Sequence, residues 1–210
     1  MSPDQGTKNN ILLYGSKNSG HSYKARLLML MGKIEHEYEH VDIFIPFNER
    51  QENFQKVSEF GEVPVLVDDG QVLAQSNAIL LHLARKFDVL GAANETGWDK
   101  ITSWLFWEAN RLGRSYPNFR YCKLFDKSAD AGLVSWFETT AHGDLDRLNR
   151  ELENKDFLTG EMTIADISCA AYLLYQDVEV IKLDNWPNVE NWLDRIRSAP
   201  GWQHPLDVMA

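Results

Sequence analysis

In the first ninety residues, short apolar runs alternate with apolar positions at helical spacing. Strand-like runs occupy 10–14, 38–45, 63–67 and 72–74, and the last two flank the turn sequence Asp68-Asp69-Gly70, which is a hairpin signal. Apolar residues at helical spacing occupy 22–32 and 76–87, while the polar stretch 47–59 suits a short helix or a loop. The pattern predicts the order β-α-β-α-β-β-α, a mixed sheet with helices.

Beyond residue 97 the apolar positions recur at helical spacing and no strand pattern is convincing. The predicted helices are 98–112, 129–152, 164–178 and 189–199. All seven tryptophans lie in this part, whereas residues 1–90 contain none. The small and glycine residues of 88–97 suit a linker. We therefore predict two domains, an α/β domain over 1–87 and an all-helical domain over 98–210.

Composition and charge narrow the functional class. The formal net charge of −10 repels phosphate backbones, which argues against a nucleic-acid partner. No apolar run approaches the length of a membrane span, and the first residues lack the basic and apolar regions of a secretory signal. Cys122 and Cys169 have neither CxxC spacing nor metal-ligand neighbours, so we expect packed thiols and no metal site. A cytoplasmic protein is the default expectation.

The stretch from Gly61 to Ile79 carries the most specific chemistry. Pro64 interrupts an apolar strand, which fits the start of an edge strand or a cis turn, because proline removes a donor from the ladder. A cis bond would turn the N–H and C=O of Val63 outward, toward a peptide-like ligand. Gln75 and Ser76 open the next helix, whose N-terminal N–H groups and dipole favour a carboxylate.

This pattern resembles the glutathione S-transferase family, in particular its bacterial, serine-type members. The likeness covers nearly the whole chain: the stretch 13–26, the Val63-Pro64 and Gln75-Ser76 pairs, the tryptophan-rich helical half and the Thr163-Ile164-Ala165-Asp166 helix cap. It implies a thioredoxin-like N-terminal domain followed by an all-α domain, and a cytosolic homodimeric enzyme. It also implies an activity, in which glutathione is the co-substrate and is conjugated to a small hydrophobic electrophile or used to reduce one.

The resemblance also implies roles for particular residues. Val63 would pair through its backbone with the cysteinyl unit of glutathione, next to a cis Pro64. Gln75 and Ser76 would hold the γ-glutamyl carboxylate. Ser19 falls where serine-type classes carry the hydroxyl that faces the glutathione sulfur, and it is the predicted catalytic residue. A free thiol has a pKa of about 8.5, and one hydrogen bond beside a helix N-terminus can bring thiolate formation into the neutral range.

Each of these residues also has a structural interpretation. Ser19 could serve only as the N-cap of the first helix, and Ser16 is the other candidate hydroxyl. His21 is placed either to contact the ligand or only to shape the loop. Tyr14 should point away from the site, to the other face of the sheet. Asp166 is explained by helix capping, with Thr163 at the N-cap.

Several features leave the substrate and even the activity open. Glu62 adds negative charge beside an anionic ligand, and the glycine carboxylate of glutathione needs Gln51 or Lys56 as its partner. Trp104 and Trp107 are expected in the core, although one of them, with Glu108 or Arg111, could line the electrophile site. The alternatives are a non-catalytic, transferase-like binding or regulatory protein, and a specialised glutathione-dependent lyase, isomerase or dehalogenase.

Overall fold

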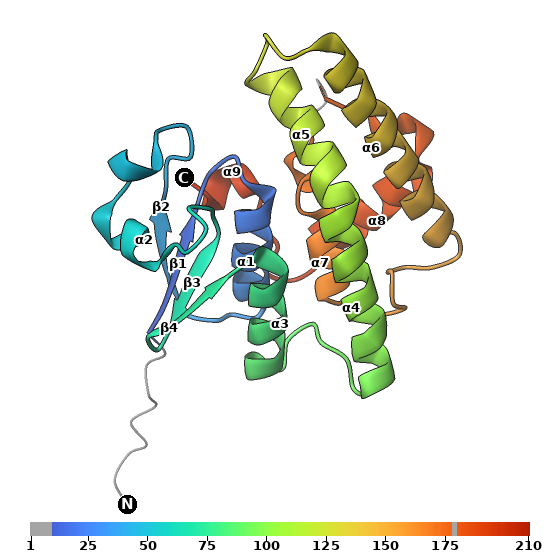
Figure 1. The fold of residues 1–210 in the computed structure, drawn as a ribbon. Helices are drawn as coiled ribbons and strands as arrows, with labels where there is room; N and C mark the ends of the chain where they lie inside the picture. Colours follow the sequence, from blue (N-terminus) through green and yellow to red (C-terminus); the bar gives the residue numbers. More distant parts are fainter. Residues whose placement is uncertain (1–9, 178–179) are drawn as a thin grey trace, which may run out of the picture.

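The computed structural model describes residues 10–177 and 180–210, and its first part is a four-stranded mixed sheet with helices on both faces (Figure 1). The elements of this part are β1 (Ile11–Gly15), α1 (Gly20–Met31), β2 (Glu37–His40), α2 (Glu52–Val57), β3 (Val65–Asp68), β4 (Gln71–Ala74) and α3 (Ser76–Phe87), with a 3₁₀ turn η1 (Phe47–Glu49). The predicted order β-α-β-α-β-β-α is confirmed.

The strand order is β2-β1-β3-β4, with β1 parallel to β2 and antiparallel to β3. Alternation along β1 divides the sheet into two faces. Leu13 joins the large core under α1 and α3, whereas Tyr14 packs with Phe54 of α2 on the other face. The expectation that Tyr14 lies on the other face of the sheet is therefore confirmed.

The hairpin between β3 and β4 turns through Asp69 and Gly70, both of which have positive φ angles.

The second part is helical. It comprises α4 (Glu95–Asn110), α5 (Leu112–Leu124), α6 (Ala131–Glu151), α7 (Ile164–Ala170), α8 (Pro187–Arg197) and α9 (Pro205–Val208), with 3₁₀ turns η2 (Leu173–Tyr175) and η3 (Leu183–Asn185). Helix α7 lies at the centre and packs against α1, α3 and α4 (Figure 1). No helix among the described residues has the length and apolar character to cross a membrane.

The chain returns to the α/β domain at its C-terminal end, where α9 lies beside the sheet (Figure 1). The hydroxyl of Tyr23 in α1 donates to the Gln203 carbonyl at 2.7 Å, and that of Tyr38 in β2 donates to the Met209 carbonyl at 3.1 Å. Tyr23, which is buried, and Tyr38, which is half-buried, thus fix the last segment to the first domain.

Three predicted boundaries differ from the structure by three residues or more. Strand β2 ends at His40 and not at residue 45, because the Asp42 carboxylate accepts from the Phe44 N–H at 2.9 Å and forms a turn. Helix α4 begins inside the predicted linker 88–97, where the Asn94 side chain caps it. The helix predicted over 164–178 ends at Ala170, and residue 178 lies outside the described residues.

Helix α5 was not predicted. Its sequence is polar, so apolar positions show little helical periodicity. It also contains Pro117, which cannot donate to the helical hydrogen-bond ladder and argues against a helix. The structure also breaks the predicted 98–112 helix at Arg111, where α4 ends and α5 begins.

Candidate functional site

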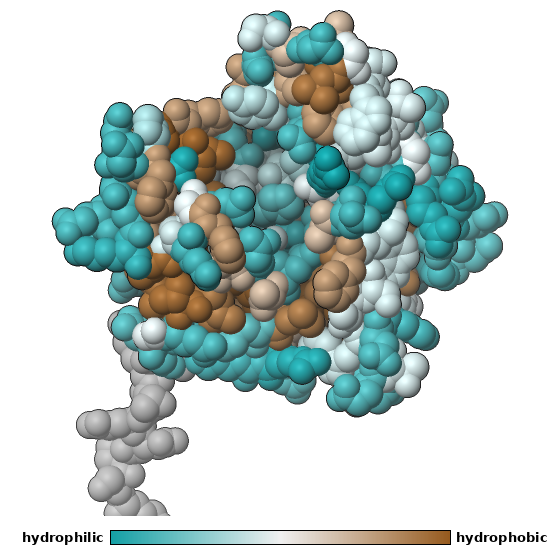
Figure 2. Space-filling view, viewed as in Figure 1, coloured by the Kyte–Doolittle hydropathy of each residue, from teal (hydrophilic) through white to brown (hydrophobic). Residues whose placement is uncertain are grey.

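A cavity of about 530 Å³ opens between the α/β domain and the helical domain, and the surface is visibly hollowed there (Figure 2). All six residues singled out from the sequence as candidate site residues line this single cavity: Ser19, His21, Val63, Pro64, Gln75 and Ser76. The motifs that are separated along the chain therefore converge in space.

Ser19 stands at the N-terminus of α1, at the edge of the cavity. It is the N-cap residue, and its Oγ accepts from the Ser22 N–H at 3.1 Å. Its side chain lines the cavity although the residue is only 5% exposed. Capping and a role at the cavity are thus compatible at this position. Ser16, the other candidate hydroxyl, is buried and is not among the lining residues.

The opposite wall is formed by the turn before β3 and by the start of α3. The Val63–Pro64 peptide bond is cis, as the resemblance implied. Gln75 has a φ angle of +69°, in the left-handed region that non-glycine residues seldom adopt and that concentrates at ligand sites. Ser76 begins the 12-residue helix α3. The first-turn N–H groups of α3 therefore face a cavity that also contains a hydroxyl, which is a favourable arrangement for a carboxylate.

Two charged residues border this wall. Glu62 accepts a hydrogen bond from the Gln75 side-chain amide at 3.4 Å. Arg50 lines the cavity, and its guanidinium donates to three backbone carbonyls, those of Ile43, Ile45 and Gly61. Arg50 therefore links three backbone positions between β2 and β3, next to this wall of the cavity.

The two residues considered for the glycine carboxylate do not reach the cavity. Gln51 donates to the His40 carbonyl, and Lys56 pairs with Glu52 at 2.7 Å on the exposed side of α2. Arg50 is the cation that lines this side of the cavity instead.

Aromatic side chains from both domains meet at the mouth of the cavity. Phe44 of the α/β domain lies 5.3 Å from Phe125 at the end of α5, and Tyr121 lies 6.0 Å from Phe125, all measured between ring centroids. Trp104 and Trp107 instead pack against each other at 5.2 Å and are not among the lining residues. The apolar rim thus comes from α5 and the loop after β2.

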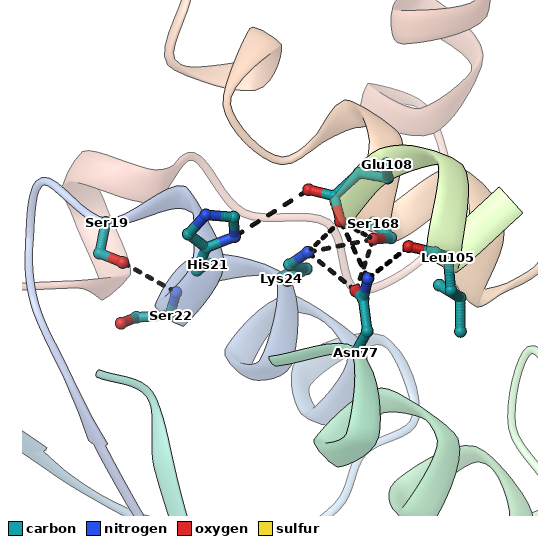
Figure 3. Close-up of polar contacts among 8 residues, drawn as sticks. All are labelled: Ser19, His21, Ser22, Lys24, Asn77, Leu105, Glu108 and Ser168. Atoms are coloured by element: carbon teal, nitrogen blue, oxygen red, sulfur yellow. Dashed lines mark hydrogen bonds and ion pairs between the residues drawn. The ribbon is translucent and has the colours of Figure 1, made fainter. Parts of the chain in front are cut away.

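A buried polar network forms the floor of the cavity and joins four helices (Figure 3). Lys24 of α1 donates from Nζ to Glu108 of α4 and Asn77 of α3, both at 2.9 Å, and to Ser168 of α7 at 3.1 Å. The side chains of Lys24 and Glu108 are 1% and 3% exposed. Asn77 also donates to Glu108 and to the Leu105 carbonyl. The charges of Lys24 and Glu108 are therefore paired, and the donors of Lys24 and Asn77 have hydrogen-bond partners, as burial requires.

His21 lies above this network. Its Nδ1 is 4.0 Å from a Glu108 carboxylate oxygen. Burial, with the nearby Lys24 charge, lowers the pKa of His21 to about 4, against the opposing influence of Glu108 and Gly113. The ring is neutral at neutral pH. Gly113 must be small, because a Cβ there would lie 2.3 Å from a Glu108 oxygen.

Tyr172, which sequence reasoning missed, also lines the cavity. It comes from the helical domain, just before η2, and its ring packs so closely on Gly20 that a Cβ there would lie 2.5 Å away. Its ring meets that of His21 edge-on at 5.1 Å between centroids. The only feature of the sequence that could have pointed to Tyr172 is its position six residues after Asp166.

The remaining polar candidates have structural roles. Asp166 forms a capping box with Thr163 and also accepts from the Leu158 N–H and the Trp192 indole, both at 2.9 Å. Cys122 and Cys169 are free and do not line the cavity. In the part of the chain that the structure describes, no group of three or more His, Cys, Asp or Glu residues is placed to hold a metal ion.

Comparison with known proteins agrees with this architecture. Residues 13–93 match the family model of the glutathione S-transferase N-terminal domain, and residues 123–200 match that of the C-terminal domain. The disulfide-bond oxidoreductase YfcG of Escherichia coli is 31% identical over 159 residues, which is 70% of this chain and 72% of that protein.

Solved structures agree over almost the full length. A glutathione S-transferase from Pseudomonas fluorescens is 26% identical with a TM-score of 0.85, covering 94% of this chain and 99% of the other. A possible glutathione S-transferase from Rhodopseudomonas palustris is 28% identical with a TM-score of 0.83, covering 93% and 98%. With a thioredoxin-like domain, an all-helical domain and family-model matches in both, the chain belongs to the glutathione S-transferase family.

Proposed function

We propose that this protein binds glutathione in the cavity and activates its thiol for attack on a small hydrophobic electrophile. The observation that carries the proposal is the convergence of the six predicted residues on one cavity that lies at the N-termini of α1 and α3. Family membership supports a glutathione-dependent activity.

The start of α3 suits the γ-glutamyl end of glutathione. Ser76 contributes a hydroxyl and the first turn contributes N–H groups, so a carboxylate there gains several charge-assisted hydrogen bonds. The ammonium group of the same unit is complemented by the Glu62 carboxylate, which adjoins Gln75. The negative charge of Glu62 is therefore compatible with binding of this ligand.

The start of α1 suits the sulfur. The Ser19 hydroxyl can donate to a thiolate, and the 12-residue helix places its positive dipole end at the same point. Proton loss from the thiol is thereby favoured. The thiolate then displaces a leaving group from the electrophile, or adds to it, while the aromatic rim provides an apolar surface that holds the electrophile close.

A second candidate is glutathione-dependent reduction of a disulfide, favoured by the 31% identity to a disulfide-bond oxidoreductase. Neither cysteine of the chain lines the cavity, so the protein supplies no thiol there and glutathione itself must provide both electrons. One glutathione thiolate attacks the disulfide and releases one thiol. A second glutathione then attacks the mixed disulfide, giving a second thiol and oxidised glutathione.

Three assays on the purified protein separate the candidates. Calorimetric titration with glutathione tests binding, a generic aryl halide tests conjugation, and hydroxyethyl disulfide tests reduction. Conjugation is the result that the proposal expects. Binding with disulfide reduction alone would select the second candidate. Binding without either activity would favour a regulatory module or a lyase, isomerase or dehalogenase specific for one metabolite. No binding at millimolar glutathione would overturn the proposal.

A further inference from the structure

The turn that carries Ser19 has two carbonyl groups that its own hydrogen bond does not use. Ser19 donates its backbone N–H to the Ser16 carbonyl at 3.0 Å, which closes a β-turn. Lys17 and Asn18 are the central residues of this turn. We call residues 16–19 the thiol turn. Its internal hydrogen bond occupies the first carbonyl only, so those of Lys17 and Asn18 need donors from elsewhere.

Both of these donors come from the helical domain. The Tyr175 hydroxyl donates to the Lys17 carbonyl at 2.8 Å. Arg120 donates from Nη1 to the Asn18 carbonyl at 3.2 Å. Tyr175 belongs to η2 and Arg120 to α5. The two carbonyls that immediately precede Ser19 are therefore held by two separate elements of the other domain.

The two donor side chains are themselves fixed in place. Tyr175 and Arg120 are each 4% exposed, and the guanidinium carbon lies 4.6 Å from the centre of the Tyr175 ring. Arg120 also donates from Nε to the Asp177 carboxylate. Because the guanidinium is planar and presents its N–H groups as a fork, the contact with Asp177 orients the N–H that reaches the thiol turn.

The contact with Asn18 fixes the peptide unit that precedes Ser19. The C=O of this unit accepts from Arg120, and its N–H, which is that of Ser19, donates to the Ser16 carbonyl. Since a peptide unit is planar, hydrogen bonds at both of its ends leave it little freedom to rotate. The plane of this unit sets the position of the Ser19 Cα, and with it the point at which the hydroxyl meets the cavity.

We infer that Tyr175 and Arg120 are positioning residues of the thiol site, which hold the thiol turn from the helical domain so that the Ser19 hydroxyl faces the glutathione sulfur. The inference rests on the proposed function. Hydrogen bonds weaken steeply with angle, so a loosened turn would align Ser19 with the thiolate for only part of the time. Stabilisation of the thiolate by a preorganised donor therefore depends on contacts from the second domain.

The test uses Tyr175→Phe, which removes one hydroxyl and keeps the buried ring. Tyr23→Phe is the matched control. Tyr23 is also buried, and its hydroxyl also joins the two domains by donating to a backbone carbonyl, that of Gln203 at 2.7 Å, but it does not line the cavity or touch the thiol turn. The two variants should therefore show similar losses of stability in urea.

The pKa of the thiol of bound glutathione, followed by thiolate absorbance near 240 nm, distinguishes the two variants. In Tyr175→Phe we expect this pKa to rise by about half a unit to one unit, so that turnover at neutral pH falls about three- to tenfold. Glutathione affinity should change by less than about twofold. Tyr23→Phe should leave the thiol pKa unchanged. In a Ser19→Ala background, Tyr175→Phe should add nothing, since Tyr175 acts through Ser19.

Arg120→Lys tests the second contact. It keeps a positive charge beside Asp177 but replaces the planar fork by a single ammonium group, so it should raise the thiol pKa in the same direction as Tyr175→Phe. A thiol pKa in Tyr175→Phe that equals that of the Tyr23→Phe control would overturn the inference.

Amide hydrogen exchange of the ligand-free protein separates this inference from the proposed function. The Ser19 N–H, which is bonded within the thiol turn, should exchange about tenfold faster in Tyr175→Phe and in Arg120→Lys than in the wild type or in Tyr23→Phe. Equal exchange at Ser19 in all four proteins would overturn the inference. A wild-type protein that does not bind glutathione would instead overturn the proposed function, while the exchange rates would still show whether the helical domain holds the turn.

Discussion

His21 and Ser19 lie two residues apart at the start of α1, but their surroundings give them different properties. Ser19 has a hydroxyl at the cavity edge and a helix to cap. His21 is packed between Tyr172, Glu108 and Gly113 and is neutral at neutral pH. A neutral imidazole beside a carboxylate can orient a ligand but adds no positive charge to the site.

The lowered pKa of His21 predicts a pH-dependent stability. The unfolded chain takes up a proton at His21 near pH 6.5, whereas the folded chain does so only near pH 4. The stability associated with neutral His21 is fully present above about pH 6.5 and falls as the pH drops toward about 4. His21→Asn should remove this part of the dependence, measured by urea unfolding between about pH 8 and pH 4. Parallel stability profiles for the two proteins would contradict the assignment.

At the scale of single elements, the cap of α7 has unusually many partners. The Asp166 carboxylate accepts from the Thr163 and Leu158 N–H groups and from the Trp192 indole, so it connects the start of α7 to the preceding loop and to α8. Because α7 packs against α1, α3 and α4, this cap supports the helix on which the two domains meet.

Asp166→Ala should lower the free energy of unfolding by about 3 kcal/mol, because three buried donors lose their acceptor. The matched control is Asp130→Ala, which removes the exposed cap of α6, where the carboxylate accepts from the Leu133 N–H at 2.9 Å. That change should cost about 1 kcal/mol. Denaturant unfolding of both variants checks the difference, and equal losses would contradict a special role for Asp166.

The charged network under the cavity gives a second prediction at this scale. Lys24→Met leaves the buried Glu108 carboxylate without its cation and should destabilise the fold by about 3–5 kcal/mol. Burial acts to raise the pKa of Glu108, but the Lys24 charge and the hydrogen bonds from Lys24 and Asn77 hold it below its usual value, so its charge must be accommodated at neutral pH.

The double variant Lys24→Met/Glu108→Gln removes both charges and should recover part of the loss. Urea unfolding of the two single variants and the double variant gives the coupling energy. Strictly additive losses would show that the pair is not coupled.

Sequence patterns predicted the elements well where the pattern is local. The strands and helices of the α/β domain, the β3–β4 turn and the Thr163–Asp166 cap were all visible in periodicity and turn residues. Helix α5 was not, since Pro117 and polar residues hide its pattern and packing against α4 and α6 stabilises it instead.

At the scale of the whole molecule, some residues of the site could be found from the sequence and others could not. Ser19, Val63 and Ser76 could be found because they lie in short motifs of one domain. Tyr172 could not, because it reaches the cavity only through the packing of the helical domain on α1, and single-chain periodicity carries no information on that packing. The same holds for the burial of Lys24, a residue type that is usually solvated.

We also expect the whole molecule to be a homodimer, as family members generally are. Sedimentation equilibrium at micromolar concentration should give about twice the 24.1 kDa mass of the chain. A mass of one chain at every concentration would contradict the expectation.

The central claim is that Ser19 activates the thiol of bound glutathione. The most direct measurement is the pKa of that thiol, followed by thiolate absorbance near 240 nm, in the wild type, in Ser19→Ala and in Ser19→Thr, which keeps both the hydroxyl and the helix cap. The account predicts a wild-type thiol pKa well below about 8.5, retained in Ser19→Thr and lost in Ser19→Ala while glutathione still binds. A Ser19→Ala protein that binds glutathione and ionises its thiol like the wild type would contradict the account.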